Sequence, residues 1–193
     1  GGCANLLEAP PPAALEAVEL CGRLPLALGL AGCIIVELAD TWQNDLVPLL
    51  REEFEDASVE ERVVNVSLRV VPEAMRDGVE GLFALYGCFP EDLTVPASAI
   101  DLLAPLMPGE EAVRQAAAKK LQVRRWLQAL LKANLLRSEA ASGSVEAGVS
   151  VHDLVRDCMI RRLEKDPAGG LRATQRQAVT LLLAAFDAAG PVA

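Results

Sequence analysis

Histidine, aromatic residues and paired cysteines are scarce in this 193-residue sequence. It contains one histidine, His152, and five scattered cysteines without a Cys-x-x-Cys pair. These residues cannot supply the four ligands of a structural zinc site, and an odd number of scattered thiols does not suit a disulfide framework. We therefore expect no metal site in this chain, and free thiols in a reducing, cytoplasmic environment.

Charge and hydropathy limit the partners of the chain. The 18 basic and 27 acidic residues give a net charge of −9, which argues against attraction of the whole surface to nucleic acid or to an anionic membrane. The apolar run Leu24–Val36 is shorter than the roughly 20 residues that span a bilayer, and it lacks the basic flank of a signal peptide. We therefore expect no membrane association.

Hydrophobic periodicity predicts a mainly α fold in three parts. A small helical domain is expected over residues 1–57, a winged-helix domain over 58–160, and the start of a further helical domain over 161–193. The segment 26–38 is apolar on almost every side, so we expect this helix to be buried all round. The predicted helices cover residues 13–21, 26–38, 42–54, 60–70, 72–86, 97–106, 110–134, 154–163 and 171–188.

Glycine, proline and β-prone residues mark the ends of these elements. Gly22 stands where a helix C-terminus prefers glycine, and Pro25 falls in the first turn of the next helix, where its missing N–H costs nothing. Two β-prone pieces, Leu135–Ser138 and Val149–His152, flank an Ala/Ser/Gly-rich stretch with Ser142-Gly143-Ser144 at its tip. Helices followed by a short β-hairpin are typical of a winged helix.

Most catalytic patterns are missing from the sequence. There is no GxxxxGK[ST] motif, so the chain cannot hold a triphosphate by itself. No spacing links His152 to a serine or cysteine nucleophile, and carboxylate pairs such as Glu52-Glu53 are typical of solvated helix surfaces. We therefore expect no catalytic residues in this chain.

Basic residues concentrate in the long helix predicted over 110–134 and just after it. This helix would enter the major groove if the winged helix read DNA, so a DNA-binding transcriptional regulator is the alternative function. Binding to DNA phosphates depends on the electrostatic field of all charges of the chain, and the strongly acidic remainder of the chain opposes such binding. We therefore favour the interpretation that these basic residues lie on a helix flank that faces solvent or a protein partner. The basic residues of the segment are Arg114, Lys119, Lys120, Arg124, Arg125, Lys132 and Arg137.

Four motifs in a fixed order resemble those of one family. Cys21–Leu28 (CGRLPLAL) resembles the GLPLAL signature of the NB-ARC nucleotide-binding module, and Leu82–Asp92 resembles the LFLYLAVFPED stretch of its winged helix. Lys132–Leu136 is similar to the segment leading into the wing, and Val151–Asp153 resembles the MHD motif. Together they cover most of the chain, which is more specific than any one motif.

The sequence departs from these motifs at two positions. Arg23 stands where a second glycine is common, and Val151 replaces the methionine of MHD. The apolar helix Ala178–Phe186 resembles the segment that follows in the scaffold of the apoptosome and its relatives. The chain thus resembles the C-terminal half of the NB-ARC module of STAND-class signalling ATPases, which act in apoptosis and plant immunity.

The resemblance implies a regulatory segment of a nucleotide-dependent switch. ADP or ATP would be shared with an upstream P-loop domain of the same protein; that parent protein would be a slow ATPase that could carry Mg²⁺ and form homo-oligomers when activated. The resemblance assigns Pro25 to contact with the adenine and His152 to contact with the β-phosphate of ADP, with weaker roles for Leu24 and for Asp153 as a positioning residue.

The chemistry of these residues agrees with those roles. An imidazole N–H is a compact donor to a diphosphate oxygen, and partial protonation near neutral pH would strengthen the bond. Asp153 can cap a helix that begins at Leu154 and so fix the backbone of His152. The alternative for His152 is a half-buried hairpin residue with a backbone partner, and Pro25 could equally be an ordinary first-turn proline.

Overall fold

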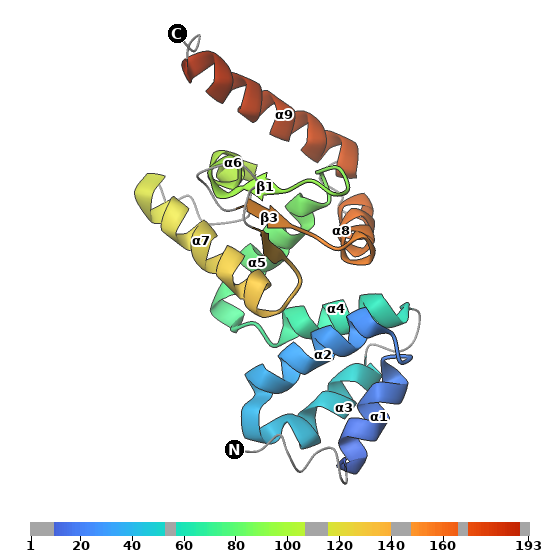
Figure 1. Ribbon diagram of the computed structural model, residues 1–193. Coiled ribbons are helices and arrows are strands. Elements are labelled where there is room, and N and C mark those ends of the chain that lie inside the picture. The colour runs from blue at the N-terminus through green and yellow to red at the C-terminus, as the bar shows by residue number, and fades with distance from the viewer. Residues whose placement is uncertain (1–9, 53–56, 107–115, 140–147, 166–169, 190–193) are drawn as a thin grey trace. The chain divides into compact units, whose positions relative to one another are not determined.

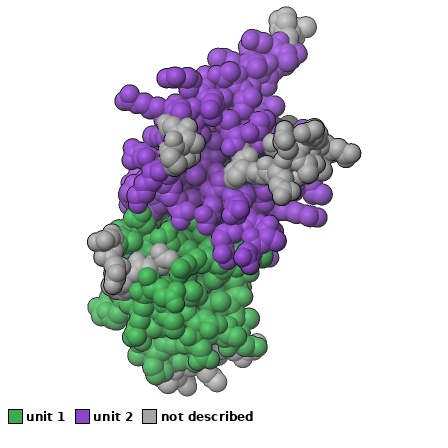
Figure 2. All heavy atoms as spheres, turned by 180° about the vertical axis from the view of Figure 1, so that it is seen from behind, with its two compact units in different colours: residues 1–72 green, residues 73–193 purple. Residues whose placement is uncertain are grey.

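The computed structural model describes residues 10–52, 57–106, 116–139, 148–165 and 170–189 (Figure 1). As the sequence predicts, it is mainly α-helical, with a small antiparallel sheet. The chain divides into two compact units, residues 1–72 (unit 1) and 73–193 (unit 2), coloured separately in Figure 2.

Unit 1 is a cluster of helices with an aliphatic core. Helix α2 packs against α3 and α4, and α1 packs against α3. Leu30, Ile34, Leu46 and Leu50 are at most 1% exposed, so they form the centre of this core. The elements of the unit are α1 (Pro12–Leu20), α2 (Pro25–Leu38), the 3-10 helix η2 (Ala39–Thr41), α3 (Trp42–Glu52) and α4 (Val59–Arg69).

Helix α2 is buried on one side only, so the prediction of burial all round is wrong. Ala27, Leu30, Ala31 and Ile34 face the core. The residues Pro25, Gly29, Gly32 and Val36, which we call the α2 outer face, are exposed, Val36 to 75%. Glycine and proline can be exposed to solvent at little cost because they carry little apolar surface. The mean hydropathy of the segment does not distinguish them from the large residues that form the core.

Helix α4 belongs to unit 1, whereas the sequence predicted that the second domain begins at residue 58. Val63, Val64 and Val66 of α4 are fully buried, and α4 contacts α2 and α3. The guanidinium of Arg62 donates a hydrogen bond to the carbonyl of Leu20 at the end of α1, 3.0 Å away. The boundary between the units therefore follows Pro72 and not residue 57.

The turn from α1 to α2 is set by two residues in the left-handed backbone region. Gly22 has φ +59° and Arg23 φ +57°. The Arg23 N–H donates to the Val18 carbonyl (3.2 Å) and the Gly22 N–H to the Glu19 carbonyl (2.9 Å), which is the bond pair of a Schellman motif. The predicted C-terminal role of Gly22 is confirmed. The left-handed backbone also explains why glycine suits the position of Arg23, since a residue with a Cβ is strained there.

This strain gives a test at Arg23. Arg23→Gly and Arg23→Ala both remove the ion pair with Glu19, but only glycine relaxes the left-handed backbone. We expect Arg23→Gly to melt about 2–6 °C above Arg23→Ala. At Gln128, an exposed position in a regular helix, the order should reverse, because glycine is the poorer helix former. Equal melting of the two Arg23 variants would contradict the assignment.

Unit 2 has the helix and hairpin order of a winged helix. Its strands pair antiparallel in the order β1-β3-β2, with Val149 of β3 lying opposite both Val95 and Ser138. The sequence predicts the hairpin but not β1, which has only two residues. The elements are α5 (Glu73–Tyr86), β1 (Val95–Pro96), α6 (Ala97–Leu103), the 3-10 helix η3 (Ala104–Leu106), α7 (Ala116–Lys132), β2 (Arg137–Glu139), β3 (Gly148–Ser150), α8 (Asp153–Lys165) and α9 (Gly170–Ala189).

Three expectations concern the limits of unit 2. The predicted helix start at Glu110 and the wing tip Ser142-Gly143-Ser144 lie outside the described residues. The boundary predicted at residues 160 and 161 falls inside α8, and α9 contacts α6 and α8. The segment predicted to begin a further domain is therefore grouped with unit 2 in this structure.

Helices α5 and α7 approach each other closely at one glycine. A Cβ at Gly78 would lie 2.0 Å from Cε2 of Trp126, whose ring therefore lies directly on the α5 backbone. Helix α7 then ends in a second Schellman motif, in which Asn134 has φ +56° and the Leu135 N–H donates to the Leu130 carbonyl at 3.0 Å. This turn directs the chain from α7 into β2.

A carboxylate links β2 to β3 and to the residue before β1 at the exposed surface of the sheet. Glu139 of β2 accepts hydrogen bonds from the hydroxyls of Ser150 of β3 (2.6 Å) and of Thr94, next to β1 (3.0 Å). These two bonds, that of Ser150 first, lower the pKa of Glu139. The charged form is thus favoured by the folded sheet.

The lowered pKa of Glu139 predicts a pH dependence of stability. The carboxylate stabilises the fold above its unfolded pKa, and this contribution is lost as the pH falls through the lower folded value. The melting temperature of the wild type relative to Glu139→Gln should therefore fall between about pH 6 and about pH 3. Ser150→Ala combined with Thr94→Val removes both donors and should flatten this difference; a wild-type advantage that does not change with pH would contradict the prediction.

Candidate functional site

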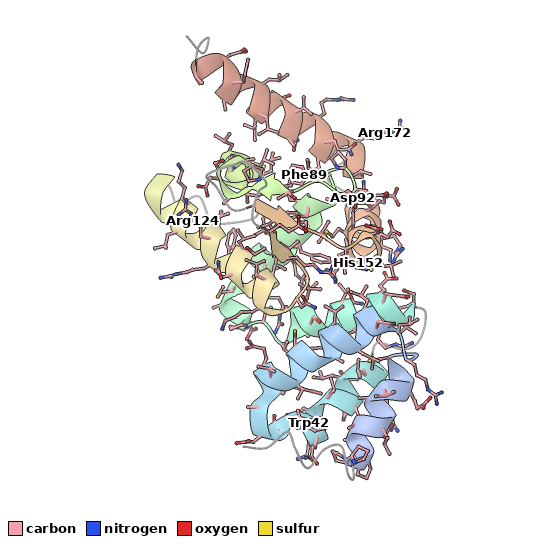
Figure 3. The ribbon with its side chains drawn as sticks, in the orientation of Figure 1. Trp42, Phe89, Asp92, Arg124, His152 and Arg172 are labelled. Carbon is pink, nitrogen blue, oxygen red and sulfur yellow. The ribbon has the colours of Figure 1, made fainter. Side chains whose placement is uncertain are left out.

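His152 lies between the last strand and the helix that follows it, at the N-terminal end of α8 (Figure 3). Its carbonyl accepts the N–H of Arg156 at 2.9 Å, the first bond of the helix. Its ring Nδ1 accepts the N–H of Leu154 at 3.3 Å. His152 is therefore the N-cap of α8, in which a side chain satisfies one of the unpaired backbone donors.

The cap determines which ring nitrogen carries the proton. A neutral imidazole has one donor and one acceptor, and because Nδ1 accepts from Leu154, the N–H of the ring is on Nε2. A doubly protonated ring has no lone pair for Leu154, so the expectation that protonation strengthens the site does not agree with this geometry. The half-buried ring thus has Nε2 as its remaining donor atom at a helix N-terminus, where backbone dipoles favour anions.

Asp153 occupies a different position from the one expected. Helix α8 begins at Asp153 itself, so the prediction that Asp153 caps a helix starting at Leu154 is wrong. The sequence could not place the helix start to within one residue, and the cap passes to the histidine. Asp153 is exposed in the first turn, where a carboxylate stabilises the positive end of the helix dipole.

Pro25 lies in the first turn of α2, as predicted, and Leu24 directly precedes the helix. Leu24 is the extended N-cap residue (φ −76°, ψ 129°), and Pro25 is the first residue of the helix and is exposed. These two residues belong to unit 1, whereas His152 and Asp153 belong to unit 2. Neither unit by itself therefore contains all four predicted site residues.

Arg156 supports the site, although it is not among the site residues predicted from the sequence. Its Nε donates to the carbonyl of Phe89 at 2.8 Å and its guanidinium pairs with Glu91 at 3.2 Å. Figure 3 shows Phe89 and His152 near α8. Arg156, four residues after His152, thus fixes the Phe-Pro-Glu-Asp segment to the first turn of α8. The sequence signal for this supporting role is that Arg156 lies about one helical turn after His152 of the MHD-like motif.

The described cysteines, Cys21, Cys33, Cys88 and Cys158, form no disulfide, as predicted. Burial raises the pKa of Cys21 and of Cys33, and raises that of Cys88 to about 11. Cys158 is buried in α8. Within the described ranges, no group of three or more His, Cys, Asp or Glu side chains is arranged to hold a metal ion.

One stretch has the length and composition to cross a membrane. It runs from Pro25 to Glu52, near the N-terminus. In the structure η2 separates α2 from α3, and Ala39 at this break has φ +49°. The two helices have 14 and 11 residues, each below the roughly 20 needed to span a bilayer. We therefore interpret the stretch as two helices of unit 1.

The basic face of α7 is exposed and partly paired. Val123, Trp126, Leu127 and Leu130 form the buried side of the helix. Arg124 on the outer side pairs with Asp101 of α6 at 3.4 Å. The other exposed basic residues of α7 are Lys120, Arg125 and Lys132, whereas Arg114 and the side chain of Lys119 lie outside the described part.

No family model matches the chain, and no curated protein is significantly similar to it.

A duplex-binding experiment tests the alternative function. We expect no sequence-selective binding of DNA at about 0.15 M salt, because the acidic surface opposes the basic helix. Fluorescence anisotropy with a randomised duplex pool measures this. A selective site that is lost on Arg124→Glu, or on charge reversal at Lys119, Lys120 or Arg125, would instead support a transcriptional regulator.

Proposed function

We propose that this chain is the regulatory, ADP-contacting segment of an NB-ARC-like molecular switch, without its P-loop domain. The observation that carries the proposal is the N-cap geometry of His152, which leaves Nε2–H as the donor at the positive end of α8. The MHD-like motif would thus contact the β-phosphate through the Nε2–H of its imidazole. The order of the four motifs supports the same family.

The contact can act as a latch between two states. A hydrogen bond to a charged group contributes about 1.5–3 kcal/mol, and its loss shifts a two-state equilibrium about 10- to 150-fold. ADP would hold unit 2 to the upstream P-loop domain, and exchange for ATP would release it. This is sufficient for switching if the two states differ by only a few kcal/mol.

The start of α2 is the proposed adenine contact. Pro25 is exposed and Leu24 is 36% exposed, so both offer apolar surface at a helix N-terminus. The α2 outer face continues from Pro25 to the exposed Val36 through Gly29 and Gly32, which carry no side chain. We propose that the upstream nucleotide-binding domain covers Leu24 and Pro25 at the start of this face.

The parent protein would supply what this chain lacks. Its P-loop would hold the phosphates and any Mg²⁺, and it would be a slow ATPase that forms homo-oligomers in the cytoplasm when activated. The chain of residues 1–193 should therefore bind ADP more weakly than about 1 µM by calorimetry, since the phosphate cradle is missing.

Substitutions at His152 in the parent protein separate its two roles. His152→Asp keeps a good N-cap but replaces the donor by a negative charge, so we expect near wild-type stability and loss of bound ADP. His152→Ala loses both roles and should also lower the free energy of unfolding by about 0.5–2 kcal/mol. Bound ADP after purification and thermal melting are the two measurements.

A second N-cap provides the matched control. Ser58 accepts the N–H of Glu61 at 3.2 Å at the start of α4, so Ser58→Ala should lose similar stability while keeping ADP. If His152→Asp retains full ADP, the imidazole is only a cap, and the proposed latch is wrong.

A further inference from the structure

Helix α9 has one packed side and one exposed side. Ala178 is 5% exposed, α9 contacts α6 and α8, and Gln175 donates to the carbonyl of Cys88 at 3.4 Å. The C-terminal half of α9 extends past the other labelled elements of unit 2 (Figure 1). The exposed side of this half carries Val179, Leu183 and Phe186, which are 54%, 58% and 71% exposed.

These exposed residues form a continuous stripe with a charge at each end. The spacing 179, 183, 186 places the three apolar side chains on one helical face. Arg176 precedes them by about one turn and Asp187 follows them, and both are exposed. We call these five residues the α9 stripe. It is apolar in the middle, positive at its N-terminal end and negative at its C-terminal end.

We propose that the α9 stripe pairs with the α9 stripe of a second copy of this chain, in antiparallel orientation. Placing Val179 opposite Phe186 of the other copy puts Leu183 near the two-fold axis. Arg176 then lies within about 3 Å, along the helix axis, of the level of Asp187 of the other copy, which an arginine side chain spans. Each copy thus contributes the same surface, as a two-fold interface requires.

The charges favour this orientation over the parallel one. A parallel pair would bring the two Arg176 side chains together and the two Asp187 side chains together. The antiparallel pair brings opposite charges together and also opposes the two helix dipoles. The pairing needs no nucleotide, so it goes beyond the proposed switch.

The size of the stripe predicts a weak dimer. One pair of helices covers less surface than the roughly 1,200–2,000 Å² of standard interfaces, so we expect half-dissociation at about 10–100 µM. Analytical ultracentrifugation of residues 1–193 across this range should show a monomer–dimer equilibrium. A monomer at all concentrations up to about 1 mM would overturn the proposal.

Apolar variants test whether the stripe is the interface. Leu183→Lys and Phe186→Ser should abolish the dimer while the circular dichroism melting curve stays unchanged, because both side chains are already exposed. A dimer that survives both substitutions uses another surface, and that result would overturn the proposal.

Charge reversal tests the antiparallel register. Arg176→Asp alone or Asp187→Arg alone places like charges together twice in each dimer, and should weaken it roughly tenfold. An equimolar mixture of the two variants restores both attractive pairs in the heterodimer, which should regain wild-type affinity. Failure of the mixture to associate better than either variant would overturn the antiparallel pairing.

Matched controls carry the same changes of charge on other helices. Arg125→Asp on α7 and Asp77→Arg on α5 are at exposed positions of unit 2 away from the stripe. Both should dimerise as the wild type does. Equal weakening by these controls would mean that net charge, and not the stripe, governs association.

Discussion

The contact between Gly78 and the Trp126 ring is the constraint on which unit 2 depends. It allows α7 to lie directly on the α5 backbone, and no side chain larger than hydrogen fits between them. The position of α7 fixes the turn at Asn134, the turn fixes β2, and β2 pairs with β3. Because β3 leads into His152 two residues later, the N-terminus of α8 is positioned by a packing contact far from it in sequence.

Local signals in the sequence predicted most of the helices, because helix ends depend on nearby residues. Gly22 and Pro25 marked the turn between α1 and α2, and hydrophobic periodicity predicted a helix over residues 110–134, where α7 lies. Features that depend on contacts between distant residues were not predicted. Strand β1 has only two residues, and the inclusion of α4 in unit 1 depends on the packing of Val63 and its neighbours. The sequence predicted Asp153 as the cap of α8, whereas His152 takes this role. The two can be told apart only when the first residue of the helix is known.

His152 combines two tasks that constrain each other. Its Nδ1 completes the hydrogen bonding of α8, and this bond leaves the other nitrogen as the donor. Arg156 fixes the same turn to the segment around Phe89, so the ring is presented on a supported helix end. A ligand that pulled the ring away from Leu154 would also weaken the helix start, which couples ligand contact to local folding.

The buried thiols allow the opening of each unit to be followed separately. Alkylating reagents attack the thiolate, and burial raises the pKa of Cys21, Cys33 and Cys88, which lowers the thiolate fraction of each. Labelling of Cys21 would then require unit 1 to open, and labelling of Cys158 would require unit 2 to open. The chain thus carries its own intrinsic reporters, whose modification rates read out the opening of each unit by mass spectrometry without an added probe.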